Sequence, residues 1–260
     1  IFKIITAAAG LNNGFNPSST LTGSNVITLP DTVTELTNYA NQKCNGQDAV
    51  TLQTAFALSC NTAFVEMSEQ LGADELRKYA KAFGGGENYD LGVSTSAGTL
   101  GDLPDGEATA QSAIGQRDVT MTALQAAVMA GTVANKGTRM QPYLVNRITD
   151  SQMKDIRTTK PKKADQAVNE ETAATLTDLM YASERSSAGY DGNGFASKTG
   201  TAEHGEGLAP HVWYVAFDPE RDIAVGVVVK NGGNLGESAT GGKVSGPIGR
   251  AILRAYQGEQ

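Results

Sequence analysis

Three short groups of residues in this chain carry side chains that could act together on an amide bond. Lys3 lies near the start, Ser59 and Asn61 flank a cysteine, and Lys198 begins the run Lys198-Thr199-Gly200-Thr201. A serine hydroxyl attacks a carbonyl well only when a nearby base removes its proton. A lysine can be that base when it is neutral, and burial or a second cation lowers its pKa. These residue types predict acyl transfer through a serine, with Lys3 as proton acceptor and Lys198 as a retained positive charge.

Ser59 and Asn61 stand two residues apart, just before an expected helix over 62–71. The Ser59 hydroxyl is suited to relaying a proton to a leaving amine, and the Asn61 amide to orienting a substrate backbone. A simpler interpretation is that one of the two side chains caps the helix. The pair of residues alone does not separate these interpretations.

The second lysine motif lies on a predicted strand. The Lys198 ammonium and the hydroxyls of Thr199 and Thr201 suit a carboxylate anion. Gly200 lets a peptide substrate approach the backbone closely and pair with the strand edge. The backbone N–H of Thr201 is suited to one half of an oxyanion hole. We expect this strand to be the substrate-binding wall of the site.

Other chemistries fit the sequence less well. The segment 192–199 lacks one glycine of a phosphate-binding loop, because Ser197 stands where that glycine is needed, and a strand rather than a helix is expected after Lys198. His204 and His211 are the only histidines, no G-x-S-x-G motif occurs, and the cysteines are far from both histidines. We expect no metal and no cofactor, and we expect His204 to be an ordinary surface residue.

Composition narrows the class of protein further. The 260 residues are 40% hydrophobic and carry a formal net charge of −7 with a pI near 4.9, which argues against binding nucleic acid. No segment has the roughly 20 apolar residues of a membrane span. Cys44 and Cys60 are either two ordinary thiols or one disulfide, and a disulfide implies an oxidising, extracytoplasmic setting.

Hydrophobic periodicity predicts helices first and strands last. Residues 87–118 are predicted to be an ordered loop region, and 150–166 an exposed polar connection. The expected helices are 2–11, 52–57, 62–71, 74–83, 121–135 with Thr120 as its cap, 169–185 and 246–256. The expected strands are 143–148, 195–201, 212–217 and 223–229, the last two forming an antiparallel hairpin. This order predicts an α+β fold.

These motifs and their surroundings resemble the transpeptidase domain of class B (monofunctional) penicillin-binding proteins, and most nearly the A-type enzymes of actinobacteria. The resemblance runs in order through nearly the whole chain. It is carried by residues 2–8, 59–64, 114–116, Gly137 with 142–143, 198–203 and 241–252.

The resemblance implies an antiparallel sheet flanked by helices, an all-helical lobe, and an active site between them. We expect residues 1–260 to be one transpeptidase domain, with the helical lobe mainly in 15–140 and the sheet mainly in 141–260. The chain is expected to lack N-terminal strands of the sheet. The nucleophilic serine is expected immediately before Ile1, either outside a chain that begins there or omitted because it carries a covalent adduct. We favour the second explanation, because cutting a core helix beside its nucleophile would expose apolar surface.

The implied function is that of a peptidoglycan D,D-transpeptidase that cross-links stem peptides ending in D-Ala-D-Ala and is inhibited covalently by β-lactam antibiotics. Its expected partners are cell-division proteins, and its expected place is the extracytoplasmic face of the membrane, held by an N-terminal anchor. The alternatives are a β-lactam sensor, or a β-lactamase or D,D-carboxypeptidase of the same fold. Glu87 and Glu107 are the only acidic candidates for activating a deacylating water in the loop region after Ser59.

Overall fold

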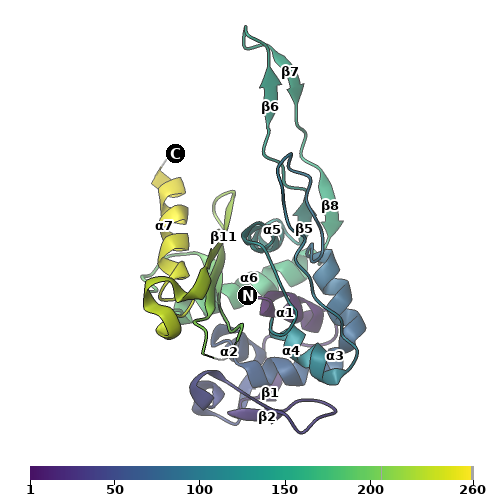
Figure 1. The fold of residues 1–260 in the computed structure, drawn as a ribbon, viewed down its shortest axis with the longest axis vertical. Helices are drawn as coiled ribbons and strands as arrows, with labels where there is room; N and C mark the ends of the chain where they lie inside the picture. The colour runs from purple at the N-terminus through teal and green to yellow at the C-terminus, as the bar shows by residue number, and fades with distance from the viewer. Residues whose placement is uncertain (206, 259–260) are drawn as a thin grey trace.

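The computed structural model describes residues 1–205 and 207–258, and its helices and strands alternate along the chain (Figure 1). Within those residues, none of the helices is long and apolar enough to span a bilayer. The α-helices are α1 (Lys3–Leu11), α2 (Leu52–Ala57), α3 (Asn61–Ala82), α4 (Gly106–Ala113), α5 (Ala123–Ala134), α6 (Glu170–Ser186) and α7 (Ser245–Gly258). Short 3-10 turns cover Tyr39–Asn41, Cys44–Gly46 and Lys230–Ser238. The strands are β1 (Thr20–Thr22), β2 (Val26–Thr28), β3 (Glu35–Thr37), β4 (Ala49–Thr51), β5 (Thr138–Met140), β6 (Arg147–Thr149), β7 (Asp155–Thr158), β8 (Lys163–Gln166), β9 (Ala196–Ala202), β10 (His211–Asp218) and β11 (Ile223–Val229).

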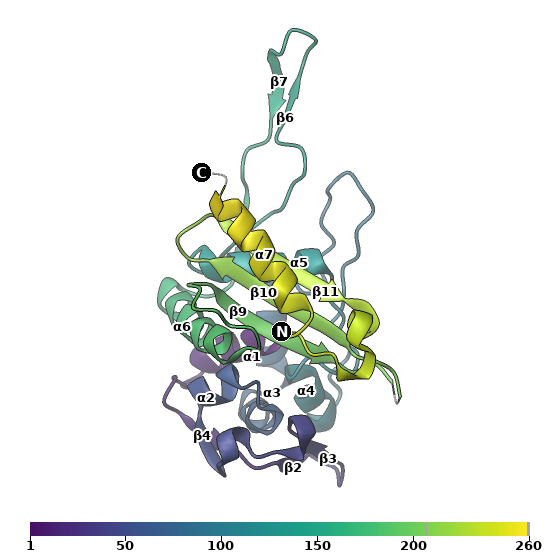
Figure 2. The ribbon, with the colours of Figure 1, turned by 90° about the vertical axis from the view of Figure 1, so that its left-hand side faces the viewer.

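The main sheet is antiparallel, in the order β11-β10-β9. Its central strand pairs with both neighbours, so that Val215 stands opposite Lys198 on one side and Gly226 on the other. Helix α7 covers one face, α5 packs against the other, and α6 lies along β9 (Figure 2). The expected antiparallel hairpin is therefore confirmed. Within the described residues β9 pairs with β10 alone and leaves its second edge open.

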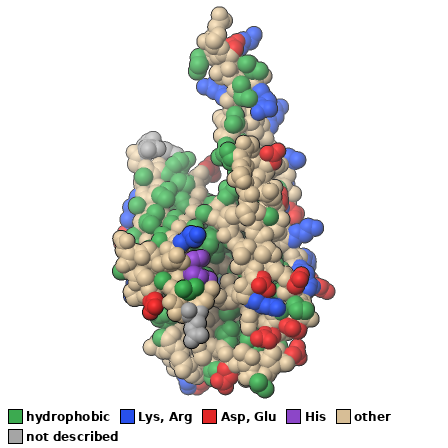
Figure 3. Space-filling view, viewed as in Figure 1, with side chains coloured by type: hydrophobic (Ala, Val, Ile, Leu, Met, Phe, Trp, Pro, Cys, Tyr) green, Lys and Arg blue, Asp and Glu red, His purple; other side chains and the backbone are tan. Residues whose placement is uncertain are grey.

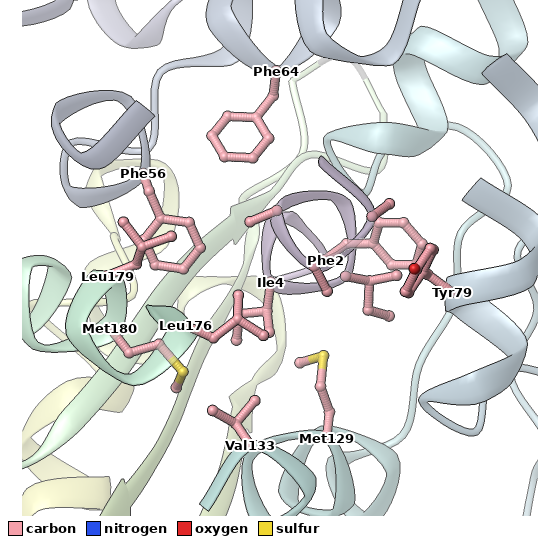
Figure 4. Packing of buried hydrophobic residues seen from close by; sticks show 14 of the residues in the cluster. Phe2, Ile4, Phe56, Phe64, Tyr79, Met129, Val133, Leu176, Leu179 and Met180 are labelled. Atoms are coloured by element: carbon pink, nitrogen blue, oxygen red, sulfur yellow. The ribbon is translucent and has the colours of Figure 1, made fainter. Parts of the chain in front are cut away.

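Helix α1 lies at the centre of the molecule because its sequence is apolar or small on every side. All residues from Lys3 to Gly10 are buried. Figure 4 shows aromatic and aliphatic side chains from α2, α3, α5 and α6 converging on Ile4 and its neighbours. Burying one such side chain contributes roughly 1.5–3 kcal/mol. A Cβ at Gly10 would lie 2.7 Å from the Met67 sulfur, so an alanine there would require the Met67 side chain to shift where α1 packs against α3.

One loop prediction was wrong and a second was only partly right, because short elements lie inside both segments. The region 87–118 contains α4, whose N-cap Asp105 accepts a hydrogen bond of 2.8 Å from Ala108 N. An aspartate before an alanine-rich stretch was the signal for this helix. The cap of α5 is Thr122, which forms a capping box with Gln125, and not Thr120.

The connection 150–166 is exposed as expected, but it contains β7 and β8. Strand β7 pairs with β6, and β8 pairs with β5, which gives a long hairpin projecting from the body. Figure 3 shows hydrophobic and basic side chains along this projection. The predicted strand over 143–148 is shorter and later than expected, at 147–149. Strands β6 and β7 pair with each other but bury neither face. Their sequence therefore lacks the alternation of apolar and polar residues that predicts a strand.

Candidate active site

Helix α2 ends at a serine in an unusual backbone conformation. Ser59 has a φ of 60°, in the left-handed region. Its N–H donates to Phe56 O at 3.1 Å, and Cys60 N donates to Ala55 O at 2.9 Å. This is the hydrogen-bond pattern of a Schellman motif, in which glycine is the usual residue at the left-handed position. A serine here is conformationally costly, which suggests that its side chain or carbonyl has another role.

The Lys3 ε-amino group is the meeting point of the first two motifs. Lys3 Nζ lies 2.8 Å from Ser59 O, 3.2 Å from Ser59 Oγ and 2.6 Å from Asn61 Oδ1. The Asn61 amide is oriented by its other end, because Nδ2 donates to Thr37 O at 3.1 Å. Thus the start of α3 and the strained turn before it bind the same amine, and strand β3 orients Asn61 for that contact.

The alternative that Ser59 or Asn61 caps α3 is wrong. The N-cap residue of α3 is Cys60, and it makes no side-chain capping bond. Thr62 N instead donates to Asn38 Oδ1 at 3.1 Å, from a separate segment. The Asn61 oxygen is thereby left for Lys3.

Lys198 lies close to this group, buried in the sheet. Its side chain is 1% exposed, and Nζ donates to Thr199 O at 3.1 Å. Its ammonium lies 5.7 Å from the centroid of the Phe56 ring, and the Lys3 ammonium lies 5.7 Å from that of Phe64. Both distances are within the range of cation–π attraction. This aromatic pair was not predicted, although Phe64 follows Asn61 by three residues, so both lie on one helix face.

Burial gives the two lysines different protonation behaviour. Burial, and secondly the charge of Lys198, lower the pKa of Lys3 well below its ordinary value of 10.5. Burial alone lowers the pKa of Lys198 to about 8. Lys198 is therefore mostly protonated at pH 7, while Lys3 is the lysine whose proton is disfavoured by a neighbouring cation.

The remaining residues of the β9 motif lie at the open edge of the sheet. A Cβ at Gly200 would come within 2.9 Å of Ile1 N, so only glycine permits this contact with the start of α1. Thr201 Oγ1 accepts from Gly241 N at 3.4 Å, which orients this hydroxyl toward the loop before α7. Thr199 is half-buried and stands opposite Tyr214. A pocket beside this edge is lined by residues including Ile114, Gln116, Val119, Met121, Thr201 and Trp213.

Other sequence candidates lie elsewhere. The phosphate-binding loop interpretation is wrong, because Lys198 lies inside a strand. His204 is exposed and stacks on His211, with ring centroids 3.9 Å apart. Glu87 forms an ion pair of 2.6 Å with Arg139, and Glu107 Oε1 accepts a hydrogen bond from a residue of its own helix.

A disulfide lies directly against the site. Cys44 and Cys60 are bonded, with their Cα atoms 5.8 Å apart. Because Cys60 stands between Ser59 and Asn61, the bond fixes the turn that presents both residues to Lys3.

Comparison with known proteins gives the family. The family model of the penicillin binding protein transpeptidase domain matches residues 1–254. Peptidoglycan D,D-transpeptidase PbpA of Mycolicibacterium smegmatis is 44% identical over 263 residues, which is 98% of this chain and 53% of that protein. PbpA of Mycobacterium tuberculosis H37Rv is 41% identical over 268 residues, which is 99% of this chain and 54% of that protein. The chain belongs to the penicillin-binding protein transpeptidase domain family.

Solved structures agree with this assignment. The ceftriaxone acyl-enzyme complex of penicillin-binding protein A from M. tuberculosis superposes with a TM-score of 0.93 at 41% identity, covering 98% of this chain and 59% of that one. Another crystal structure of that protein gives a TM-score of 0.92 at 40% identity, covering 98% and 60%. The predicted family resemblance and α+β class are therefore confirmed. The chain spans about half the length of the curated relatives that it matches.

Removal of the disulfide tests its structural contribution. The variant Cys44→Ser/Cys60→Ser is expected to lose about 3 kcal/mol of unfolding free energy, because the bond closes a loop of about 16 residues in the unfolded chain. Urea denaturation measures the loss, and reduced wild-type protein should match the variant. Two titratable thiols in unreduced wild-type protein would contradict the bond.

Substitutions at Ser59 separate backbone strain from chemistry. Ser59→Gly and Ser59→Ala both remove the hydroxyl, but glycine adopts a φ of 60° without strain. In the natural full-length protein, we expect Ser59→Gly to be more stable than Ser59→Ala by about 1 kcal/mol, with acylation by a labelled penicillin slowed equally in both. Thermal unfolding and labelling rates measure the two effects. Wild-type labelling by both variants would show that the hydroxyl is not needed.

Proposed function

We propose that this chain is the transpeptidase domain of a peptidoglycan D,D-transpeptidase, acting on stem peptides that end in D-Ala-D-Ala. The observation that carries the proposal is the convergence of Ser59 and Asn61 on a buried Lys3 beside a second buried lysine, Lys198. That arrangement lowers the cost of a neutral lysine, which is what a base for a serine hydroxyl requires. We treat 1–260 as one domain, with its helical lobe mainly in 15–140 and its sheet mainly in 141–260.

The nucleophile in this proposal is a serine immediately before Ile1. The chain already turns in the helical sense there, because Ile4 N donates to Ile1 O at 3.1 Å and Phe2 has φ −58° and ψ −24°. A serine three residues before Lys3 would share a helix face with it. Neutral Lys3 has two N–H groups for Ser59 O and Asn61 Oδ1, and its lone pair is left for a hydroxyl proton.

The reaction then proceeds in two acyl transfers. The serine oxygen attacks the penultimate D-Ala carbonyl, and its proton passes to Lys3. Ser59 is placed to carry that proton to the departing nitrogen, since its hydroxyl lies 3.2 Å from Lys3 Nζ. Free D-alanine leaves, and an amine of a second stem peptide then attacks the acyl carbonyl. The amine proton passes through Lys3 to the serine oxygen as the bond from the acyl carbon to that oxygen breaks, which regenerates the serine.

The β9 edge binds the substrate in this scheme. Lys198 supplies a retained charge, and Thr199, Gly200 and Thr201 offer an open strand edge for a peptide and its terminal carboxylate. A β-lactam would occupy the same place, as relatives of this chain were solved as ceftriaxone and penicillin G acyl-enzymes. No cofactor enters the scheme.

We place the enzyme at the extracytoplasmic face of the membrane, held by an N-terminal segment outside this chain, with cell-division proteins as partners. The Cys44–Cys60 bond supports an oxidising compartment. A β-lactamase is favoured less, because Glu87 is paired with Arg139 rather than with a group that touches Lys3. A β-lactam sensor would keep the same residues. Release of D-alanine distinguishes a transpeptidase from such a sensor.

Release of D-alanine tests the proposed function. The natural full-length protein, given a D-Ala-D-Ala pentapeptide donor and a D-amino acid acceptor, should release D-alanine and form the exchanged peptide. Lys3→Met should lower kcat about 10²- to 10⁴-fold, whereas Lys160→Met, at an exposed lysine, should not. Penicillin labelling without D-alanine release would instead show a sensor, and rapid nitrocefin turnover a β-lactamase.

The pH dependence of acylation tests the roles of the two lysines. The rate constant should rise with pH as Lys3 loses its proton through its lowered pKa, and fall as Lys198 loses its charge above about pH 8. This gives a bell-shaped profile in wild-type protein. In Lys198→Arg the alkaline fall should move beyond pH 9, because a guanidinium stays protonated. An unchanged alkaline fall in that variant would exclude Lys198 as its source.

A further inference from the structure

A buried ion pair lies behind the substrate-binding strand, on the face of the sheet opposite to the lysines. Glu184 of α6 is 1% exposed, Arg250 of α7 is 2% exposed, and Arg250 Nε donates to Glu184 Oε1 at 2.6 Å. Arg250 also donates to Ala188 O at 3.0 Å and to Ser187 Oγ at 3.1 Å. Each of the three Arg250 nitrogens therefore has a hydrogen-bond partner, which lowers the cost of burying the charged pair.

The Glu184 carboxylate connects four parts of the fold. Besides Arg250, it accepts hydrogen bonds from Ser197 Oγ on β9, from Tyr214 OH on β10 at 3.0 Å, and from Asn193 Nδ2 before β9 at 2.9 Å. Burial alone would raise the pKa of Glu184, but the hydrogen bonds from Arg250, Ser197 and Asn193 outweigh it and lower the pKa. The carboxylate is thus a fixed negative group that holds two strands and two helices together.

Ser197 directly precedes Lys198, and successive residues of a strand point to opposite faces. The hydroxyl of Ser197 is held by Glu184 on the α7 face, while Lys198 extends toward Phe56 on the other face. The surrounding seam between the sheet and α7 is apolar, built from Phe195, Tyr214, Ala216, Val225 and Leu253. An apolar seam alone would pack the helix on the sheet, and a buried ion pair is a costly way to do the same.

The ion pair does not act on Lys198 through its charge. Burial lowers the pKa of Lys198, and the ion pair, with its charges 2.6 Å apart, carries no net charge. The expected effect of the pair on Lys198 is to fix its position. Misplacing a reacting group by about 1 Å can slow an enzyme about 10²-fold.

We propose that Glu184 and Arg250 form a positioning unit that acts through Ser197 and fixes the Lys198 ammonium beside Lys3. The unit is not part of the catalytic group, because it touches neither the lysines nor the open edge of β9. The inference rests on the proposed function for its kinetic consequence, and on the structure alone for the placement of Lys198.

Ser197→Ala tests the proposal because it removes the link to β9 and leaves the ion pair intact. Tyr214→Phe is the matched control, since it removes one hydrogen bond to the same oxygen, Glu184 Oε2, from the neighbouring strand. Ser197→Thr restores a hydroxyl and should restore wild-type behaviour. Two measurements are made on the full-length protein: the pH profile of penicillin acylation, and the pKa of Lys198 by NMR of its ε-amino group.

Ser197→Ala should lower the acylation rate constant about tenfold, raise the pKa of Lys198 toward 10.5 and move the alkaline limb with it. Tyr214→Phe and Ser197→Thr should match wild-type protein in both. Wild-type values in Ser197→Ala, or equal changes in Tyr214→Phe, would overturn the proposal. If wild-type protein is not acylated, the proposed function fails. The pKa of Lys198 in Ser197→Ala still shows whether Ser197 fixes the position of Lys198.

Discussion

Two lysine side chains, Lys3 and Lys198, are buried where the charge of one acts on the other, and the rest of the fold has to accommodate that placement. Removing an ammonium from water costs several kcal/mol unless hydrogen bonds or opposite charges replace the water. Here the replacements are two carbonyl-type oxygens at Lys3, one at Lys198, and an aromatic ring near each ammonium. These are weaker than full ion pairs, so the pKa of Lys3 is lowered well below its ordinary value and its neutral form becomes easier to reach.

The elements around the lysines are arranged to hold them there. Helix α1 is apolar on all sides and therefore central, which buries Lys3 at its first turn. The left-handed conformation at Ser59 directs a carbonyl and a hydroxyl to the same amine, and the disulfide at Cys60 keeps that turn in place. On the sheet side, the β9–β10 ladder places Lys198, and Glu184 accepts a hydrogen bond from its neighbour Ser197. The two buried lysines and the left-handed turn at Ser59 are thus parts of one group.

Much of this arrangement can be predicted from the sequence. The features that cannot be predicted are contacts between residues that lie far apart in the chain. Periodicity gave α1, α2, α6, the β10–β11 hairpin and α7, and residue type with spacing selected Lys3, Ser59, Asn61 and Lys198. Helix α4 was missed because its apolar face is made of alanines, which give a weak pattern. The aromatic pair Phe56 and Phe64 and the Glu184–Arg250 pair could not be found, since their partners lie far apart in the chain and look like ordinary helix residues.

The central claim is that Lys3 is made an accessible base by burial beside Lys198. Its most direct test is an NMR titration of the Lys3 ε-amino group in wild-type protein and in Lys198→Met, with Lys160→Met as the control at an exposed lysine. The account predicts a midpoint well below 10.5 in wild-type protein, a higher midpoint in Lys198→Met, and no change in Lys160→Met. A Lys3 midpoint near 10.5 in wild-type protein would contradict it.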